Sequence, residues 1–327
     1  MRAVKEAMVV PVLLLSLAAG NVWGQPVEEA MVPDASAPMV DAGCYPGAGG
    51  PDPWYLAVDA IFLDRSTGTG QVIVTGTNGV PALTGNDIDL KTETGPRFTL
   101  RRSFGPVAAE AVYFALYNQQ AKFSTSPIGI AFGSPIIGLA FGETYTSELN
   151  NAEFNLRYYL RDSLSVLAGF RYMSLDESLR GNFFTPVLGY TNTDHRTSND
   201  MYGGQVGVNW RCIQGPQGNT ALDLGSKVGL FGNSQQMNAI VNGPLGSFAT
   251  GATASELSFV AELGLVGSLR IWDCLWVRGG YQVMWLDGIA LAPPQLSTAQ
   301  FVLPGSRVNN DACVFYHGPI AGAEVRW

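Results

Sequence analysis

Short and long connections alternate along this chain, and this pattern constrains the fold more than any other feature of the sequence. Tight turns at Phe104–Val107, Arg161–Asp162 and Ile271–Asp273, with a slightly longer one at Cys212–Asn219, alternate with gaps of roughly twenty to thirty residues. The segments between these connections predict ten strands, at Trp54–Leu63, Pro96–Phe104, Val107–Tyr117, Asn151–Leu160, Ser163–Leu175, Asp200–Arg211, Thr220–Gly232, Ser255–Arg270, Cys274–Leu286 and Asp311–Trp327.

Strands joined in this way run up and down through one antiparallel sheet. The long gaps are Asp64–Gly95, Asn118–Asn150, Asp176–Asn199, Asn233–Ala254 and Asp287–Asn310. Short turns on one rim and long loops on the other are typical of all-β, transmembrane β-barrels. We therefore predict a single antiparallel up-and-down barrel of about ten strands, within a range of roughly 8–12, formed by residues 54–327.

Side chains alternate along the predicted strands. In strand 255–270 the odd-numbered positions from Leu257 to Leu265 are apolar, whereas the even-numbered ones include Glu256, Ser258 and Glu262. Strands 151–160 and 163–175 repeat the pattern. Because neighbouring side chains of a strand point to opposite faces, one face suits lipid and the other a lumen.

Composition favours a membrane barrel over a soluble β domain. Only 14% of the residues are charged, and the chain carries 39 Gly, 16 Phe, 12 Tyr and 7 Trp. After residue 24 no apolar run is long enough for a transmembrane helix, which leaves a closed barrel as the way to cross a bilayer. A net charge of -8 argues against nucleic acid as a partner.

The N-terminus indicates export. Arg2 and Lys5 precede an apolar run that ends in small residues before Gln25, as in a secretory signal peptide. We assign residues 1–24 to this signal and residues 25–53 to a disordered periplasmic segment, because the latter lack hydrophobic periodicity. The expected location is the bacterial cell outer membrane, after cleavage of the signal peptide.

Aromatic residues fall at the predicted strand ends. Two girdles result: Trp54, Phe104, Trp210, Trp272 and Trp327 at the turn rim, and Tyr172, Tyr202 and Trp285 at the loop rim. The last strand ends in Trp327 and must pair with the first to close the sheet. We expect outer-membrane lipid and the barrel-insertion machinery, acting through this C-terminal strand, as partners.

Five segments carry a family resemblance. They are Trp54–Leu63, Gly95–Phe98, Gly169–Tyr172, Asn199–Gly207 and Gly280–Pro293. In this order they resemble the beta-barrel porin 7 family of bacterial outer-membrane proteins, and the last segment is the most specific. The resemblance implies an outer-membrane barrel with a proposed role in transport; it supplies no substrate and no catalytic residue.

The inward positions predict a narrow, charged lumen. Ten strands lie close to the eight-stranded barrels whose interior side chains fill. Such charges either pair and close the lumen or form a constriction that selects small solutes. The predicted lumen charges are Arg97, Arg101, Glu110, Glu153, Arg157, Arg171, Asp223, Lys227, Glu262, Arg278 and Glu324.

Three classes of function stay open: a porin-like channel, a structural or adhesive surface barrel, and an enzyme. An omptin-like protease would need its loop acids, here Asp87 and Asp89, beside an Asp/His pair such as Asp194 and His195. Loops carry Asp routinely, so we expect no catalysis. Because the sequence shows no metal-ligand spacing and no phosphate-binding glycine loop, we also expect no cofactor and no metal. Cys44, Cys212 and Cys274 map to the turn rim, and Cys313 is expected to be unpaired.

Overall fold

The structure is a computed structural model that describes residues 53–67, 72–75, 81–84, 90–125, 129–131, 135–137, 140–185, 189–296, 298–300 and 305–327. The predicted signal peptide and almost all of the segment assigned to residues 25–53 lie outside the described residues.

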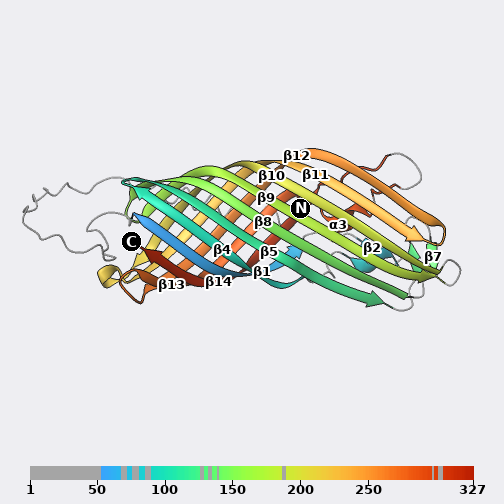
Figure 1. The fold of residues 1–327 in the computed structure, drawn as a ribbon, viewed down its shortest axis with the longest axis horizontal. Helices are drawn as coiled ribbons and strands as arrows, with labels where there is room; N and C mark the ends of the chain where they lie inside the picture. The colour runs from blue at the N-terminus through green and yellow to red at the C-terminus, as the bar shows by residue number, and fades with distance from the viewer. Residues whose placement is uncertain are drawn as a thin grey trace, which may run out of the picture. The chain divides into compact units, whose positions relative to one another are not determined.

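Ten antiparallel strands form one closed barrel, in which each long strand is hydrogen-bonded to its neighbours along the chain (Figure 1). This confirms the predicted all-β, up-and-down architecture. The strands are β1 (Trp54–Thr67), β4 (Leu90–Phe104), β5 (Val107–Thr125), β8 (Ala140–Arg161), β9 (Leu164–Thr185), β10 (Gly189–Gln214), β11 (Thr220–Gly243), β12 (Gly246–Arg270), β13 (Leu275–Ile289) and β14 (Ala312–Arg326).

At the turn rim the strands end within three residues of their predicted ends, but most extend further at the loop rim. The prediction of loops at Asp176–Asn199 and Asn233–Ala254 is wrong: β9 pairs with β10, and β11 with β12, almost to the hairpin tips. Alternation continues through these stretches, with Leu179, Met237 and Ala239 buried on the inner face. Most of their outward neighbours, such as Ser178, Arg180 and Asn238, are polar, which conceals the strand pattern in the sequence.

The remaining connections carry short elements. Two small hairpins, β2 (Val72–Thr75) with β3 (Pro81–Thr84) and β6 (Gly129–Ala131) with β7 (Pro135–Ile137), lie within the first two long loops. A 3-10 turn, η2 (Pro216–Gly218), and a single helical turn, α3 (Ala292–Gln295), follow. Within the described part of the chain, no helix combines the length and apolar character needed to cross a membrane.

The barrel closes where the first strand meets the last, as predicted. The backbone N–H of Trp54 donates to the carbonyl of Trp327 at 2.8 Å, and the reverse bond is 3.1 Å. The two indole rings stack with centroids 6.2 Å apart. β1 and β14 stay paired up to Thr67 and Val314, so this seam leaves no open edge over the height of the shorter strands.

Apolar side chains cover the outside of the barrel in a belt next to the turn rim. Phe154, Phe170 and Val206 are more than half exposed there. On β9 the belt runs from Leu164 to Tyr172, and beyond it the outward positions become polar, as at Asp176 and Arg180. This height equals the roughly 9–11 residues that a tilted strand needs to cross the hydrocarbon core.

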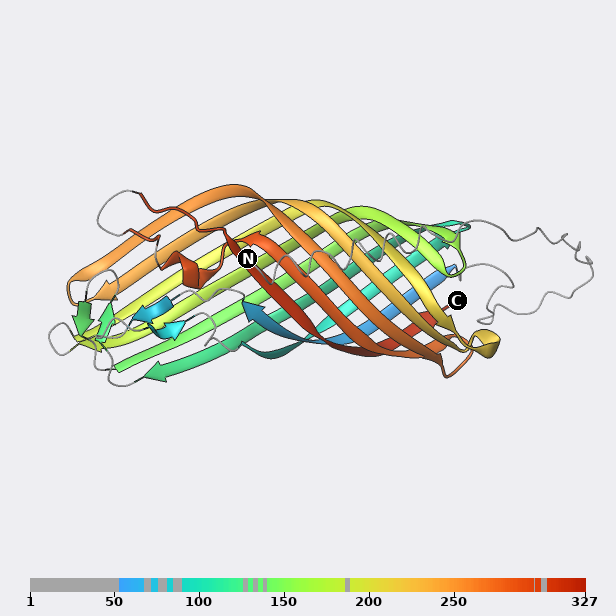
Figure 2. The same ribbon diagram turned by 180° about the vertical axis from the view of Figure 1, so that it is seen from behind.

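The strands differ in height above this belt. β8–β12 have 22–26 residues, whereas β1, β4, β13 and β14 have only 14 or 15. Figures 1 and 2 show the longer strands continuing as one wall beyond the ends of β13 and β14. The loop between β13 and β14 therefore starts at a lower level than the ends of the neighbouring strands β8–β12.

Candidate functional site: the lumen of the barrel

A central cluster of buried charges crosses the lumen. Arg171 lies 3.1 Å from Glu262 and 3.7 Å from Glu153, and Lys227 approaches the same two carboxylates at 3.3 and 3.0 Å. The Arg171 side chain is only 1% exposed. These four charged residues come from four different strands. Because an unpaired charge away from bulk water costs much free energy, their mutual pairing stabilises the cluster.

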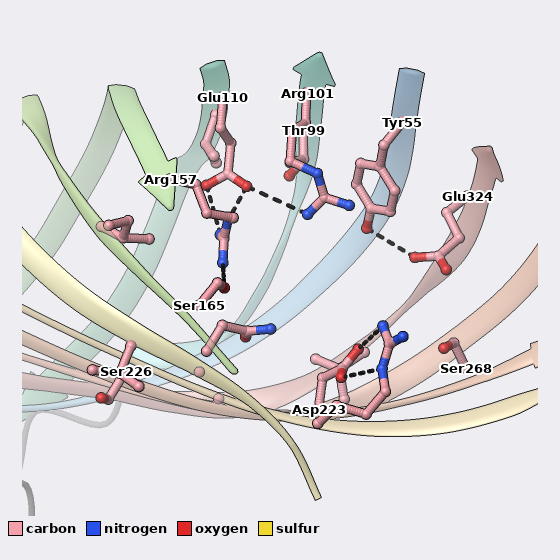
Figure 3. A pocket seen from close by; sticks show the side chains of 18 of the residues that line it. Tyr55, Thr99, Arg101, Glu110, Arg157, Ser165, Asp223, Ser226, Ser268 and Glu324 are labelled. Atoms are coloured by element: carbon pink, nitrogen blue, oxygen red, sulfur yellow. Dashed lines mark hydrogen bonds and ion pairs between the residues drawn. The ribbon is translucent and has the colours of Figure 1, made fainter. Parts of the chain in front are cut away.

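A second set of charges lies closer to the turn rim (Figure 3). Arg157 donates to both oxygens of Glu110 at 2.9 and 3.1 Å and to the Ser165 hydroxyl at 2.9 Å. On the opposite wall Arg211 binds Asp223 at 2.9 Å. These pairs join neighbouring strands, because Arg157 and Ser165 lie near the β8–β9 turn and Arg211 is in register with Asp223.

This second set surrounds a cavity of about 450 Å³. Asp162, Ser163 and Gln214, which belong to the turn rim or border it, line the cavity as well. The space therefore reaches the turn rim, and we call it the chamber. At its inner end the chamber meets the central cluster, since Lys227 and Glu262 are part of its wall.

An apolar layer fills the lumen on the loop-rim side of the central cluster. Met173 follows Arg171 on β9, Phe231 follows Lys227 on β11, and Met284 is 1% exposed on β13. Side chains in this layer are almost fully buried, so they exclude water from the middle of the barrel. The layer consists of Ile61, Leu63, Phe114, Leu116, Leu149, Met173, Leu175, Met201, Phe231, Val260, Met284 and Leu286.

Residues 288–295 comprise the last two residues of β13 and the segment that follows it, and this segment is inserted into the barrel above the apolar layer. Ala290 and Leu291 are at most 1% exposed. The Asn199 side chain accepts a hydrogen bond from the backbone N–H of Ala290 at 2.8 Å and donates to its carbonyl at 2.7 Å. Asn199 belongs to β10, three strands from β13. A segment that leaves β13 and bonds to β10 must cross the inside of the barrel.

Further polar groups hold the two ends of this inserted segment. The Asn233, Gln235 and Ser258 side chains all donate to the carbonyl of Gly288, at 3.4, 3.0 and 2.7 Å. At the far end Gln295 donates to the carbonyl of Asn309 at 2.7 Å. Residues 288–295 thus form a lid across the lumen, anchored at both ends by neutral hydrogen bonds.

One buried ion pair supports the lid. Glu177 of β9 accepts the backbone N–H of Ala292 at 2.8 Å with one oxygen and binds Arg65 of β1 with the other. The Arg65 guanidinium lies between two aromatic rings, 5.6 Å from the centroid of Tyr145 and 5.8 Å from that of Tyr316. The pair therefore connects the lid to opposite sides of the barrel wall.

The predicted lumen charges lie in these layers. Glu153 and Arg171 belong to the central cluster. The other nine border the chamber: Arg97, Arg101, Glu110, Arg157, Asp223, Lys227, Glu262, Arg278 and Glu324. In addition Asp59, Arg211 and Arg326 form lumen ion pairs that the sequence analysis did not single out. Strand alternation indicates that Asp59 and Arg211 point into the lumen, because Asp59 follows the outward Val58 and Arg211 follows the outward Trp210.

Asp194 and His195 do not share a site. His195 is buried on the inner face of β10, whereas Asp194 lies on the outer face, 2.7 Å from Arg196 and 3.6 Å from Arg180. Adjacent residues of a strand point apart, so these two groups cannot activate one water between them. Asp87 and Asp89 lie outside the described residues. The described residues contain no group of three or more His, Cys, Asp or Glu placed to hold a metal ion.

The cysteines divide into two kinds. Cys274, at the turn rim, is disulfide-bonded. Cys212 and Cys313 carry free thiols, as expected for Cys313.

Two buried titratable groups face the interior above the apolar belt. They are Glu143 of β8 and His195 of β10. His195 is followed by the exposed, outward Arg196, and Glu143 lies farther from the belt than the exposed, outward Glu148 of the same strand, so both groups are outside the belt. Burial raises the pKa of the Glu143 carboxyl to about 8. Burial also lowers the pKa of the His195 imidazole to about 4, in spite of the nearby Asp194 charge. Both groups are therefore neutral inside the folded barrel at pH 7.

Glu143 should make stability depend on pH. Its pKa rises from 4.5 in the unfolded chain to about 8 in the folded one, so the folded protein binds more protons between these values. The contribution is complete below pH 4.5 and is lost as the pH rises toward 8. Relative to the wild type, Glu143→Gln should therefore gain stability between pH 5 and pH 8, measured as the urea midpoint of unfolding in micelles. The exposed Glu148→Gln is the control; identical pH profiles for the two variants would show that Glu143 is not protonated in the fold.

Comparisons with known proteins find only distant structural similarity. No family model and no curated protein sequence matches the chain. Among solved structures, the outer-membrane protease OmpT from Escherichia coli is similar, with a TM-score of 0.45 and 9% identity over 85% of this chain and 97% of that chain. The translocator domain of the autotransporter NalP from Neisseria meningitidis gives 0.38 and 11%, over 84% and 88% of the two chains. The P. putida toluene transporter TodX gives 0.31 and 11%, over 86% and 91%. At this level of similarity no function transfers from those proteins to this chain.

Proposed function

We propose that this chain is a porin-like protein of the bacterial outer membrane, related to the beta-barrel porin 7 family, whose lumen is closed at rest by residues 288–295. The outer surface supports a membrane location. The apolar belt has the height of a hydrocarbon core, and Trp54 and Trp327 at the turn rim and Tyr172 and Tyr202 at the other boundary frame it.

The proposal includes the route to the membrane. A signal peptide at residues 1–24 would direct export, and the strand that ends in Trp327 would present the chain to the barrel-insertion machinery. The turn rim, which contains both Trp54 and Trp327, would then face the periplasm, and the high wall of β8–β12 would face the outside.

Leu263→Arg tests whether the belt meets lipid. Leu263 points outward in the middle of the belt on β12, so an arginine there should lower the free energy of unfolding by roughly 2–4 kcal/mol in lipid vesicles. Ser255→Arg changes an exposed outward position of the same strand above the belt and should cost little. Equal losses in urea titrations of the two variants would contradict the assigned membrane boundary.

One observation distinguishes a closed or gated lumen from an open diffusion pore: the chamber reaches the turn rim but is blocked farther inside the barrel. The central cluster, the apolar layer and the lid lie in sequence between the chamber and the loop rim. General diffusion pores have about sixteen strands and an aqueous lumen, which ten strands filled in this way do not provide. Passage of a small solute therefore requires residues 288–295 to move and the side chains of the apolar layer beneath them to rearrange.

The bonds that hold the lid suit such a movement. Asn199, Asn233, Gln235 and Ser258 hold it through neutral hydrogen bonds, each worth about 0.5–1.5 kcal/mol net, because water replaces them when they break. A covalent or purely apolar seal would not exchange in this way. A structural or adhesive barrel is the alternative, and it differs from a gated channel by never conducting.

Planar-bilayer recording separates these possibilities. The wild type should show sealed bilayers with rare, brief openings, whereas Asn199→Ala should open at least about tenfold more often, because it removes two lid bonds and leaves the Ala290 backbone groups unpaired. Asn238→Ala is the control, since Asn238 is exposed on the outer face of β11.

Each recording has a defined reading. Stable, large wild-type conductance would contradict the closed lumen. Sealed bilayers for Asn199→Ala, at a protein load where heat-modifiable gel migration shows folded barrel, would favour the structural alternative.

A further inference from the structure

The chamber next to the turn rim has an excess of positive charge, although the chain as a whole is negative at -8. The ion-paired lumen groups from this rim to the central cluster comprise eight cations and six anions. The cations are Arg97, Arg101, Arg157, Arg171, Arg211, Lys227, Arg278 and Arg326, and the anions are Asp59, Glu110, Glu153, Asp223, Glu262 and Glu324.

The carboxylates around the chamber already have close partners. Glu110 accepts two hydrogen bonds from Arg157, and Asp223 accepts two from Arg211. Glu324 is bound by Tyr55 at 2.8 Å and by Arg278 at 3.2 Å. Asp162 also lines the chamber, but it is exposed at the rim, where water screens its charge. The two excess positive charges must therefore be located on cations with incomplete pairing.

Arg101 is such a cation. Its nearest carboxylate oxygen, on Glu110, is 3.8 Å away, beyond hydrogen-bond distance, and its Nε has no hydrogen-bond partner in the described part of the chain. The Tyr55 ring holds the guanidinium from one side, 4.2 Å from the ring centroid. Figure 3 shows this group between Glu110 and Tyr55, in the wall of the chamber. Arg101 thus presents a fixed, planar set of donors that the protein does not use.

Unused hydroxyls accompany it. Tyr159 lines the chamber within electrostatic range of Arg101, and its buried hydroxyl makes no hydrogen bond to a described residue. On another part of the wall, the buried Ser268 hydroxyl has no described partner either. Arg211 adds a second positive charge near enough to Arg101 to repel it. These hydrogen-bond donors surround the chamber without acceptors of their own. A ligand that carries hydrogen-bond acceptors would therefore complement them.

We propose that the chamber binds a small oxyanion, the carboxylate or phosphate group of a solute that enters from the turn rim, with Arg101 and Tyr159 as its main donors. An Arg fork matches the paired oxygens of either group, and these charge-assisted bonds are the strongest available at such a site. A space of about 450 Å³ suits a small organic anion and is too small for an oligosaccharide chain. Binding does not depend on conduction, so failure of the gated-channel proposal would leave this one standing.

Titration calorimetry of the full-length protein in micelles, with citrate and with inorganic phosphate as probes, tests the site. The wild type should bind at least one probe, more weakly as salt rises. Arg101→Gln should weaken binding by about tenfold or more, because a charge-assisted hydrogen-bonding group is lost. Arg102→Gln is the matched control: it removes the same charge from the next residue, which points outward over the Trp54 and Phe104 rings, and should leave affinity unchanged.

The probes also separate the two sources of oxyanion, since preference for citrate indicates a carboxylate and preference for phosphate a phosphoryl group. Failure of the wild type to bind either probe, or equal affinity in Arg101→Gln and the wild type, would overturn the proposal. Should Arg101→Gln fail to fold in a heat-modifiability assay, Tyr159→Phe carries the same test. This variant keeps every charge and should weaken binding by about threefold or more through one lost hydrogen bond; unchanged affinity would count against the site.

Discussion

The alternation of side chains across a closed sheet is the constraint on which the rest of this structure depends. Every second residue of each strand must enter a lumen that ten strands make narrow. Outward positions are free to be apolar, as at Phe154 and Phe170, but inward charges such as Arg171 cannot reach bulk water. They are tolerated only because other strands supply partners at the same height, as Glu153 and Glu262 do.

Charge pairing alone would leave a polar column through the barrel, but the apolar layer and the lid interrupt this column. Met173 and Met284 replace charge with apolar volume immediately beyond the central cluster. The lid then closes the space that the short strands β13 and β14 leave beside the high wall. The lid is bonded to Asn199 and Glu177, which belong to the longer strands. The closed lumen therefore depends on the unequal heights of the strands. The chamber is what remains open, on the side of the short turns.

Sequence reasoning reaches the features that depend on one strand at a time. The ends of the strands at the turn rim, the outward Phe154 and the inward Arg171 all follow from alternation and turn spacing. The loop-rim ends do not, because outward Ser, Asn and Gln make β9–β12 look like loops above the belt. Glu177 of β9 falls in a predicted loop for that reason, and Arg65 falls in the predicted loop Asp64–Gly95 because β1 continues beyond Leu63; both side chains are buried in the lumen.

The lid could not be predicted from the sequence, for a different reason. Its anchors come from four other strands, at Glu177, Asn199, Asn233 and Ser258, and no local pattern links them to residues 288–295. The separation of Asp194 from His195 follows from alternation only once the strand is known to continue through them. Pairing across a barrel depends on register, and register is fixed by the closed sheet as a whole.

Thiol accessibility tests the central claim, that residues 288–295 close the lumen, most directly. In a variant with Cys212 and Cys313 changed to serine, Leu291→Cys places a thiol in the lid, and Tyr190→Cys places one at an exposed outward position near a hairpin tip. With folded protein in lipid vesicles and a membrane-impermeant thiol reagent, the account predicts rapid labelling at position 190 and labelling at least about a hundredfold slower at position 291, because the lid must open first. Equal labelling rates at the two positions would show that the segment lies outside the barrel, and the closed lumen would then be wrong.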